Sequence, residues 1–182
     1  MRLFLALDLP EPARAAVAAW RDELVAGRED LRPVVVSALH VTLVFLGWQF
    51  EKDAERIAEL SGRALGGHAA ARLTPLAVKP VPRRGPRLFA LDLGDAESRA
   101  SAAQAALSSA LATARLYRPE RRPFWPHLTL ARVKRGRRAG PLEPVGLPQA
   151  FGASRVTLYR SILRPQGAAY EALYSVELRS HT

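Results

Sequence analysis

The chain has 182 residues, of which 48% are hydrophobic, and this fits one domain or two small lobes that share an interface. It contains no cysteine, which excludes disulfides and thiolate chemistry, and 27 Lys and Arg residues against 17 Asp and Glu residues give a formal charge of +10. The most apolar region, residues 34–48, is shorter than a membrane span, and residues 1–8 are too short for a signal peptide. We therefore expect a cytoplasmic protein without membrane contact. The charge makes a polyanion a candidate partner, although a solvated basic surface is an equal alternative for the loop over residues 134–138 alone.

The first half of the chain predicts three strands and two helices, from the period of its apolar residues and from its stop signals. The expected elements are a strand over residues 2–8, a helix opened by residues 10–12 and ended by Gly27, strands over residues 34–36 and 40–47, and a helix that begins at Asp53 and ends at residues 66–67. Asp53 suits the N-cap because its carboxylate can accept a hydrogen bond from a free backbone N–H.

The second half repeats a similar order. The expected elements are strands over residues 72–81 and 88–93, an Ala-rich helix from Asp95 to about Leu116, a strand that starts at His127, and strands over residues 156–159 and 173–178 joined by a hairpin through residues 165–167. Pro75 and Pro80 make the first of these strands an edge or irregular one. The basic, proline-rich stretches 119–126 and 134–148 predict loops. The whole order predicts an α+β fold with antiparallel sheets and helices on one face of each.

Two copies of the pattern His-x-Thr-Leu, about half a chain apart, organise the sequence. Successive side chains of a strand lie on opposite faces, so His40 shares a face with Thr42, and His127 shares a face with Thr129. The residues expected to face the core are Val41, Leu43, Phe45, Leu128 and Leu130. We expect two similar halves that each contribute one His-Thr strand to a shared cleft.

Histidine titrates near neutral pH, so two histidines that face one cleft can divide acid and base roles. One would take a proton from water and the other would protonate the leaving oxygen, while the threonine hydroxyls donate hydrogen bonds to phosphoryl oxygens. A lone histidine in an apolar strand is usually structural, but here two of the four share one sequence context. His68 and His181 have no such context and are expected at the surface.

Other chemistries fit the sequence less well. It has no closely spaced zinc ligands, no Gly-x-x-x-x-Gly-Lys-Ser/Thr phosphate loop and no Gly-x-Ser-x-Gly nucleophile elbow. These patterns are typical of zinc hydrolases, ATP-driven enzymes and serine esterases. We expect neither a metal ion nor a cofactor.

The chain resembles the 2H phosphoesterases, which are named for two His-x-Thr/Ser motifs. It is most similar to their bacterial RNA 2′,3′-cyclic phosphodiesterase branch, historically called 2′-5′ RNA ligases. The segments that carry the resemblance are residues 2–10, 39–47, 126–133, 158–161 and 167–170. The resemblance implies one domain over residues 1–182, made of two intertwined, pseudo-symmetric lobes. Each lobe would have an antiparallel sheet with helices on its outer face, and a central cleft would hold both motifs.

The resemblance also implies metal-independent hydrolysis of RNA 2′,3′-cyclic phosphate ends to 2′-phosphates. His40 would be the general acid that protonates the departing 3′ oxygen, and His127 the general base that acts on water, although near-symmetry leaves this direction open. Thr42 and Thr129 would bind the phosphoryl oxygens. Weak, reversible 2′-5′ RNA ligation is expected to accompany hydrolysis, because stabilising one transition state catalyses both directions. No obligatory protein partner is expected.

Three side chains outside the two motifs are considered as further substrate contacts. Arg87 is a candidate phosphate contact, although an ordinary surface arginine is an equal alternative. Phe89 stands where the branch often has tryptophan and is a candidate for stacking on a base. Arg132 falls on the opposite strand face from His127, so we expect no direct role for it.

Two alternatives to the RNA enzyme remain. One is a phosphodiesterase of a small nucleotide cyclic phosphate, against which the basic loops count. The other is a non-catalytic RNA-binding protein on the same fold, against which the intact motif pair counts.

Overall fold

A computed structural model describes residues 1–164 and 167–180 of the chain. Its elements, with η for 3-10 helices, are β1 (Arg2–Asp8), α1 (Glu11–Leu24), β2 (Leu31–Pro33), η1 (Val36–Ala38), β3 (His40–Trp48), η2 (Glu51–Asp53), α2 (Ala54–Leu65), β4 (Ala71–Val81), β5 (Leu88–Gly94), α3 (Arg99–Thr113), β6 (His127–Val133), β7 (Phe151–Ala153), β8 (Arg155–Arg164) and β9 (Gly167–Glu177).

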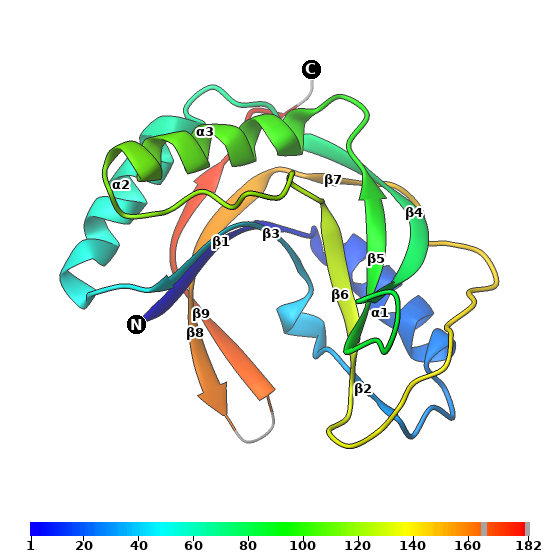
Figure 1. The fold of residues 1–182 in the computed structure, drawn as a ribbon. Helices are drawn as coiled ribbons and strands as arrows, with labels where there is room; N and C mark the ends of the chain where they lie inside the picture. The colour runs from blue at the N-terminus through cyan, green and yellow to red at the C-terminus, as the bar shows by residue number, and fades with distance from the viewer. Residues whose placement is uncertain (165–166, 181–182) are drawn as a thin grey trace.

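The strands form two antiparallel sheets, in the orders β3-β1-β8-β9 and β2-β6-β5-β4-β7. Helices α2 and α3 pack against each other, and α3 also contacts β3 and β4. Figure 1 shows these two helices on the outside of the molecule and α1 behind β5 and β6. The predicted α+β class with antiparallel sheets is confirmed.

One hydrophobic cluster joins the two sheets. It contains Leu5 of β1, Val41 of β3, Leu91 of β5 and Leu128 of β6, all essentially inaccessible to solvent. Val41 and Leu128 alternate with the histidine and threonine of their own motif, which lie on the other face of the strand. The core therefore fixes which face of each motif strand is left for chemistry.

A short internal repeat places the two motif strands equivalently. Strand β1 reads Arg-Leu-Phe-Leu-Ala-Leu-Asp and β5, with the residue before it, reads Arg-Leu-Phe-Ala-Leu-Asp. Each strand runs antiparallel to a motif strand, with Asp8 opposite His40 and Asp92 opposite His127. The two histidines thus occupy matching positions in two similar pairs of antiparallel strands, β1 with β3 and β5 with β6, which supports the expected pseudo-symmetry.

The predicted helices agree with the structure, with differences at their ends. The carboxylate of Asp95 accepts hydrogen bonds from the backbone N–H groups of Ala100 and Ser101 at 3.2 and 2.8 Å, as a cap should. Asp53 occupies the N-cap position of α2, but its side chain makes no capping hydrogen bond.

The shortest strands differ from the prediction. The predicted strand over residues 34–36 is wrong: β2 lies three residues earlier, where it pairs with β6, and residues 36–38 form η1. Strand β7 was not predicted and pairs with the first residues of β4, so β4 is an edge strand only beyond them. A register shift between Pro75 and Ala77 does make β4 irregular.

The last two strands pair antiparallel and are longer than predicted. Pro165 and Gln166 of the expected hairpin turn lie outside the described residues. His181, which was expected at the surface, lies outside them as well.

Candidate active site

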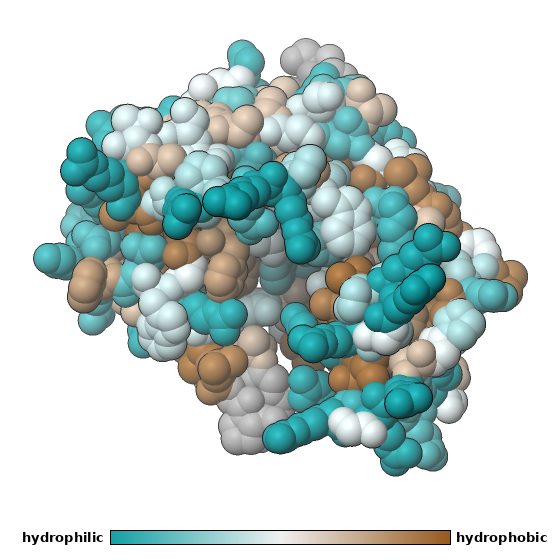
Figure 2. Space-filling model, in the orientation of Figure 1, coloured by the Kyte–Doolittle hydropathy of each residue, from teal (hydrophilic) through white to brown (hydrophobic). Residues whose placement is uncertain are grey.

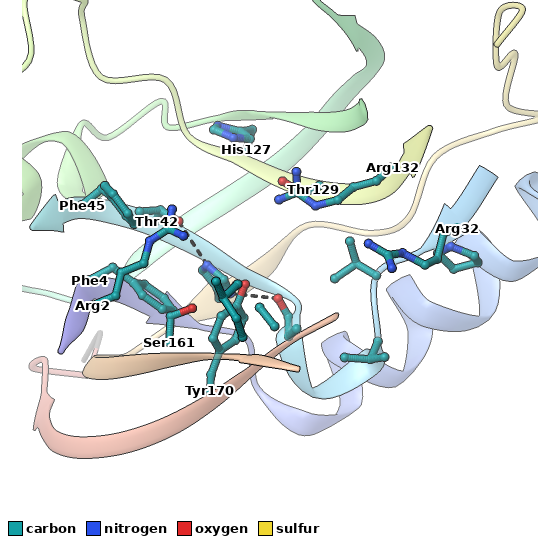
Figure 3. Close-up of a pocket in the computed structure, with 17 residues that line it drawn as sticks. Arg2, Phe4, Arg32, Thr42, Phe45, His127, Thr129, Arg132, Ser161 and Tyr170 are labelled. Atoms are coloured by element: carbon teal, nitrogen blue, oxygen red, sulfur yellow. Dashed lines mark hydrogen bonds between the residues drawn. The ribbon is translucent and has the colours of Figure 1, made fainter. Parts of the chain in front are cut away.

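A cleft of about 550 Å³ lies between the two sheets, and both sequence motifs line it. His40 and Thr42 line it from β3, and His127 and Thr129 line it from β6. Figure 3 shows Thr42 on one side of the cleft and His127 and Thr129 on the other. Figure 2 shows this face of the molecule hollowed at its centre, with strongly hydrophilic side chains around the hollow. The predicted meeting of the two motifs in one cleft is therefore present.

Both histidine rings are held in the same way. Nδ1 of His40 donates to the carbonyl oxygen of Ala38, and Nδ1 of His127 donates to that of Trp125, each at 2.8 Å and each two residues earlier in the chain. A carbonyl oxygen can only accept, so Nδ1 carries the hydrogen in both rings. Nε2 of each neutral ring is then left as a proton acceptor.

His40 lies among aromatic rings. The ring of Phe4 is 4.9 Å from it and the edge of Tyr170 is 5.2 Å from it, between centroids. Burial among these groups lowers the pKa of His40 to about 4, against the effect of the Ala38 carbonyl, and electrostatic repulsion from His127 in its protonated form and from Arg14 lowers it further. His40 is therefore neutral at pH 7, and its Nε2 lies 3.1 Å from the hydroxyl of Thr42.

His127 has polar support. The indole of Trp125 stacks on its ring at 4.1 Å, with 17° between the planes. The indole N–H donates to Asp92 at 2.6 Å, and the other carboxylate oxygen of Asp92 is 2.5 Å from the ammonium of Lys79. This chain of contacts from Lys79 to His127 was not predicted. The signal that could have found it is the position of Asp92 in the internal repeat, opposite His127.

Asp8, the repeat partner of Asp92, supports the other histidine through different residues. It accepts hydrogen bonds from the hydroxyls of Thr157 at 2.6 Å and Tyr159 at 2.8 Å. Burial, together with the negative charge of Asp8, raises the pKa of Tyr159 to about 12, so the phenol stays protonated and donates. Its ring lies 5.3 Å from Phe4, which in turn packs on His40.

Two residues predicted to face away from the cleft line it instead. The strand registers skip Leu43 in β3 and Leu130 in β6, so the leucine of each His-x-Thr-Leu motif is an extra residue in its ladder. Such a bulge shifts the alternation by one position. Phe45 and Arg132, each five residues after a motif histidine, therefore line the cleft, and both sequence-based placements are wrong.

The two further candidate contacts do not line the cleft. Phe89 is fully buried and packs in a small cluster with Leu31 and Ala131, so it offers no face to a base, and the stacking hypothesis is wrong. Arg87 is exposed on the turn before β5. Their repeat partners Arg2 and Phe4 do line the cleft.

A difference of one residue in spacing explains why Phe4 lines the cleft and its repeat partner Phe89 does not. Phe4 lies four residues before Asp8, whereas Phe89 lies three residues before Asp92. Because strand faces alternate, a difference of one residue places the second phenylalanine on the core face.

No helix within residues 1–164 and 167–180 is long and apolar enough to span a membrane. The same part of the chain holds no group of three His, Asp or Glu side chains arranged to bind one metal ion.

Comparisons with known proteins agree with this geometry. Residues 9–161 match the family model of the 2′-5′ RNA ligase superfamily. The RNA 2′,3′-cyclic phosphodiesterase of Thermus thermophilus is 32% identical over 98% of this chain and 91% of its own length. The Escherichia coli protein of the same name is 29% identical over 88% of this chain and 86% of its own length.

Solved structures share the fold as well. A Thermus thermophilus protein matches with a TM-score of 0.83 and 30% identity over the whole of both chains. Escherichia coli LigT complexed with 3′-AMP matches with a TM-score of 0.78 and 28% identity over 97% of each chain.

Proposed function

The chain belongs to the 2′-5′ RNA ligase superfamily, and from this membership and its cleft we propose that it hydrolyses RNA 2′,3′-cyclic phosphate ends to 2′-phosphates. One observation carries the proposal. Two histidines, each held through Nδ1 by the backbone, reach one cleft from pseudo-equivalent strands with Nε2 as the remaining proton acceptor. Relatives named RNA 2′,3′-cyclic phosphodiesterase over nearly the whole chain support the choice of substrate.

The proposed reaction is an in-line displacement at phosphorus. His127 takes a proton from water as the water oxygen bonds to phosphorus, and the bond from phosphorus to the 3′ oxygen breaks. His40 gives its proton to the departing 3′ oxygen, which leaves the phosphate on the 2′ oxygen. The hydroxyls of Thr42 and Thr129 donate to the non-bridging oxygens, where negative charge increases in the transition state.

The low pKa of His40 constrains its role as the acid, because the neutral ring has no proton to give from Nε2. A bound phosphodiester anion favours the charged imidazolium, and this effect is strong in a partly buried site. In this proposal His40 gains its proton when substrate binds. The reverse assignment, with His40 as base, is the alternative for the same geometry.

The same side chains can supply every proton transfer and every hydrogen bond of this scheme, so we propose a reaction that needs no metal ion or cofactor. The guanidinium groups of Arg2, Arg32 and Arg132 line the cleft, and together with the +10 charge they favour RNA over a small cyclic nucleotide. Weak 2′-5′ joining is the reverse of the same step.

The test is to incubate the protein, with a chelator present, with an oligoribonucleotide that ends in a 2′,3′-cyclic phosphate and separately with a mononucleoside 2′,3′-cyclic phosphate. We expect a 2′-phosphate product from the oligonucleotide without added metal. A 3′-phosphate product, or strict dependence on a metal ion, contradicts the mechanism. Turnover of the mononucleotide alone favours the small-nucleotide enzyme, and binding without turnover favours the non-catalytic protein.

The first mutational prediction concerns the histidines. His40→Ala and His127→Ala should each lower kcat by roughly 10²- to 10⁴-fold, the usual contribution of a general acid or base. Circular dichroism and RNA binding should stay close to those of the unchanged protein. Unchanged turnover in either variant would remove that histidine from the proposed mechanism.

A further inference from the structure

Two large aromatic side chains stand in solvent just beyond the cleft. Trp48, at the end of β3, is 79% exposed, and Phe50, two residues later, is 74% exposed. A single exposed apolar residue is ordinary on a protein surface. Two such rings within three residues, next to a binding cleft, form a patch of the kind that marks an interaction site.

The backbone between these rings is held firmly. The N-terminal ammonium of Met1 donates to the carbonyl oxygen of Gln49 at 2.6 Å, and the N–H of Gln49 donates to Met1 at 2.8 Å. The Gln49 side chain donates to the carbonyl oxygens of Leu46 at 2.9 Å and Leu116 at 3.1 Å. The rings are therefore presented on a fixed backbone, which lowers the entropy lost when a ligand binds them.

Trp48 lies on the same sheet face as the cleft. The register of β1 and β3 pairs Arg2 with Trp48 and Phe4 with Phe45, and directly paired residues point to one face. Arg2, Phe4 and Phe45 all line the cleft, and the guanidinium of Arg2 lies 4.9 Å from the centre of the Phe45 ring (Figure 3).

Cations accompany the rings beyond the cleft as well. The ammonium of Lys52 lies 5.6 Å from the centre of the Phe50 ring. From the cleft outward, rings and positive charges thus follow one another along the chain from the end of β3 into η2.

We propose that Trp48 and Phe50 form a stacking surface for single-stranded RNA, which continues from Phe45 and Arg2. It would bind the nucleotides that lie 5′ of the terminal cyclic phosphate. This rests on the proposed function, because the occupant is the strand whose end lies at the two histidines. Alternating rings and cations are the feature that binds single strands without regard to sequence, since every base has a face to stack and every nucleotide a phosphate.

The length of β3 sets the size of this surface. Eight residues separate His40 from Trp48, so the two lie roughly 20–25 Å apart along the strand. Several nucleotides fit in that span, so the surface should act on oligonucleotides and not on a mononucleotide.

The experiment compares kcat/KM for 2′,3′-cyclic phosphate substrates of increasing length, from the mononucleotide to about eight nucleotides. In the unchanged protein kcat/KM should rise with length through a falling KM. In the doubly substituted Trp48→Leu, Phe50→Leu protein the ratio of oligonucleotide to mononucleotide kcat/KM should fall by roughly 5- to 100-fold, the range that stacking of one base represents. Trp48→Phe, which keeps an aromatic face, should retain most of the gain.

A second measurement does not need turnover. An oligonucleotide with a 3′-hydroxyl end should quench tryptophan fluorescence, and Trp48→Phe should remove most of that quenching. An oligonucleotide 2′,3′-cyclic phosphate that is not hydrolysed would refute the proposed function, and the quenching would still test the surface.

Three results would overturn the stacking surface. The first is a kcat/KM that does not depend on length in the unchanged protein. The second is a length dependence that the double leucine variant keeps but Arg32→Ala loses, because the strand would then leave the cleft past β2. The third is a change of mass in solution in the leucine variant without a change in RNA binding, because the patch would then join two copies of the chain.

Discussion

His40 and His127 are attached alike but surrounded differently. Each Nδ1 is held by the carbonyl two residues earlier, yet His40 packs on Phe4 and Tyr170, whereas His127 stacks on an indole that Asp92 holds. Environments that differ in this way separate the acid and base functions of similar groups. The proposed division of roles therefore depends on the neighbours of the motifs, which the motifs themselves do not reveal.

The pKa of His40 predicts a loss of stability on acidification. Its value of about 4 in the folded protein lies below the 6.5 of an exposed histidine, so the unfolded chain binds the extra proton between these pH values. Neutral His40 thus contributes stability above pH 6.5, and this contribution, on the order of 3 kcal/mol, is lost as the pH falls to about 4. Urea denaturation of His40→Gln should show a shallower decline over this range than the unchanged protein. A His68→Gln control should follow the unchanged protein, and equal declines in all three would contradict the prediction.

Binding of a phosphate ligand should raise the lowered pKa of His40. NMR titration should place the pKa of His40 near 4 in the free protein and clearly higher with a saturating oligoribonucleotide 2′-phosphate, the product of the proposed reaction, because the anion favours the imidazolium. His40→Gln identifies the resonance. A pKa that does not move on binding would leave His40 without a proton to donate at neutral pH, and it would favour the reverse assignment of acid and base.

For single residues, the sequence correctly predicts which strand face the motif histidines and threonines occupy, because period-two alternation is reliable within a short strand. It misplaces Phe45 and Arg132 because a bulge changes the alternation, and both bulges fall on the motif leucines, whose side chains are buried like their neighbours. Arg87 and Phe89 were the predicted contacts, and Arg2 and Phe4 were not. The two copies of the repeat differ by one residue, and only strand pairing shows which copy faces the cleft.

Among the elements, the helices were predictable and the shortest strands were not. The three helices were predictable from their apolar periods. The N-cap residue of α3 is Ser98, but the carboxylate of Asp95, three residues earlier, accepts the hydrogen bonds of its first turn as predicted. Strands β2 and β7 have three residues each and exist only through pairing with β6 and β4. A segment of that length has no period to detect, because its state depends on a distant partner.

Trp125 connects β5 to β6, because its indole donates to Asp92 of β5 and stacks on His127 of β6. These contacts predict that Trp125 positions His127. Replacing it with Ala removes the ring that stacks on His127 but keeps the carbonyl that holds Nδ1. We expect kcat to fall roughly tenfold with little change in KM, since small misplacement of a reacting group is costly. Trp125→Phe keeps a stacked ring but loses the hydrogen bond to Asp92, so its kcat should lie between those of the unchanged protein and Trp125→Ala.

The control is Trp20→Phe, which changes a tryptophan that does not line the cleft. A loss in KM alone for Trp125→Ala would mean that the indole binds substrate and does not position His127.

Over the whole molecule, a near-symmetric scaffold carries an asymmetric set of charges and rings. Both sheets offer a histidine and a threonine at matching positions, but β3 adds Phe45 and β6 adds Arg132, which lies opposite Arg32 of β2. The wall formed by β1 and β3 thus carries aromatic rings together with Arg2, whereas the wall formed by β2 and β6 carries two arginines. In the proposed mechanism this asymmetry would give RNA, whose two ends differ, one preferred orientation, whereas the two His-Thr pairs alone would allow two.

The charge of the whole molecule predicts how substrate binding responds to salt. Each phosphate of a single strand that Lys or Arg neutralises contributes about 0.7 to the slope of log affinity against log salt concentration. With +10 overall and three arginines in the cleft, KM for an oligonucleotide should rise with salt more steeply than KM for a mononucleotide, by a slope of about 2 or more. Arg32→Ala should lower the oligonucleotide slope by about 0.7, while Arg56→Ala, which changes an exposed residue of α2 outside the cleft lining, should leave it unchanged. Equal slopes for the two substrates would mean that only the terminal phosphate is bound, and the basic surface would then have no part in choosing RNA.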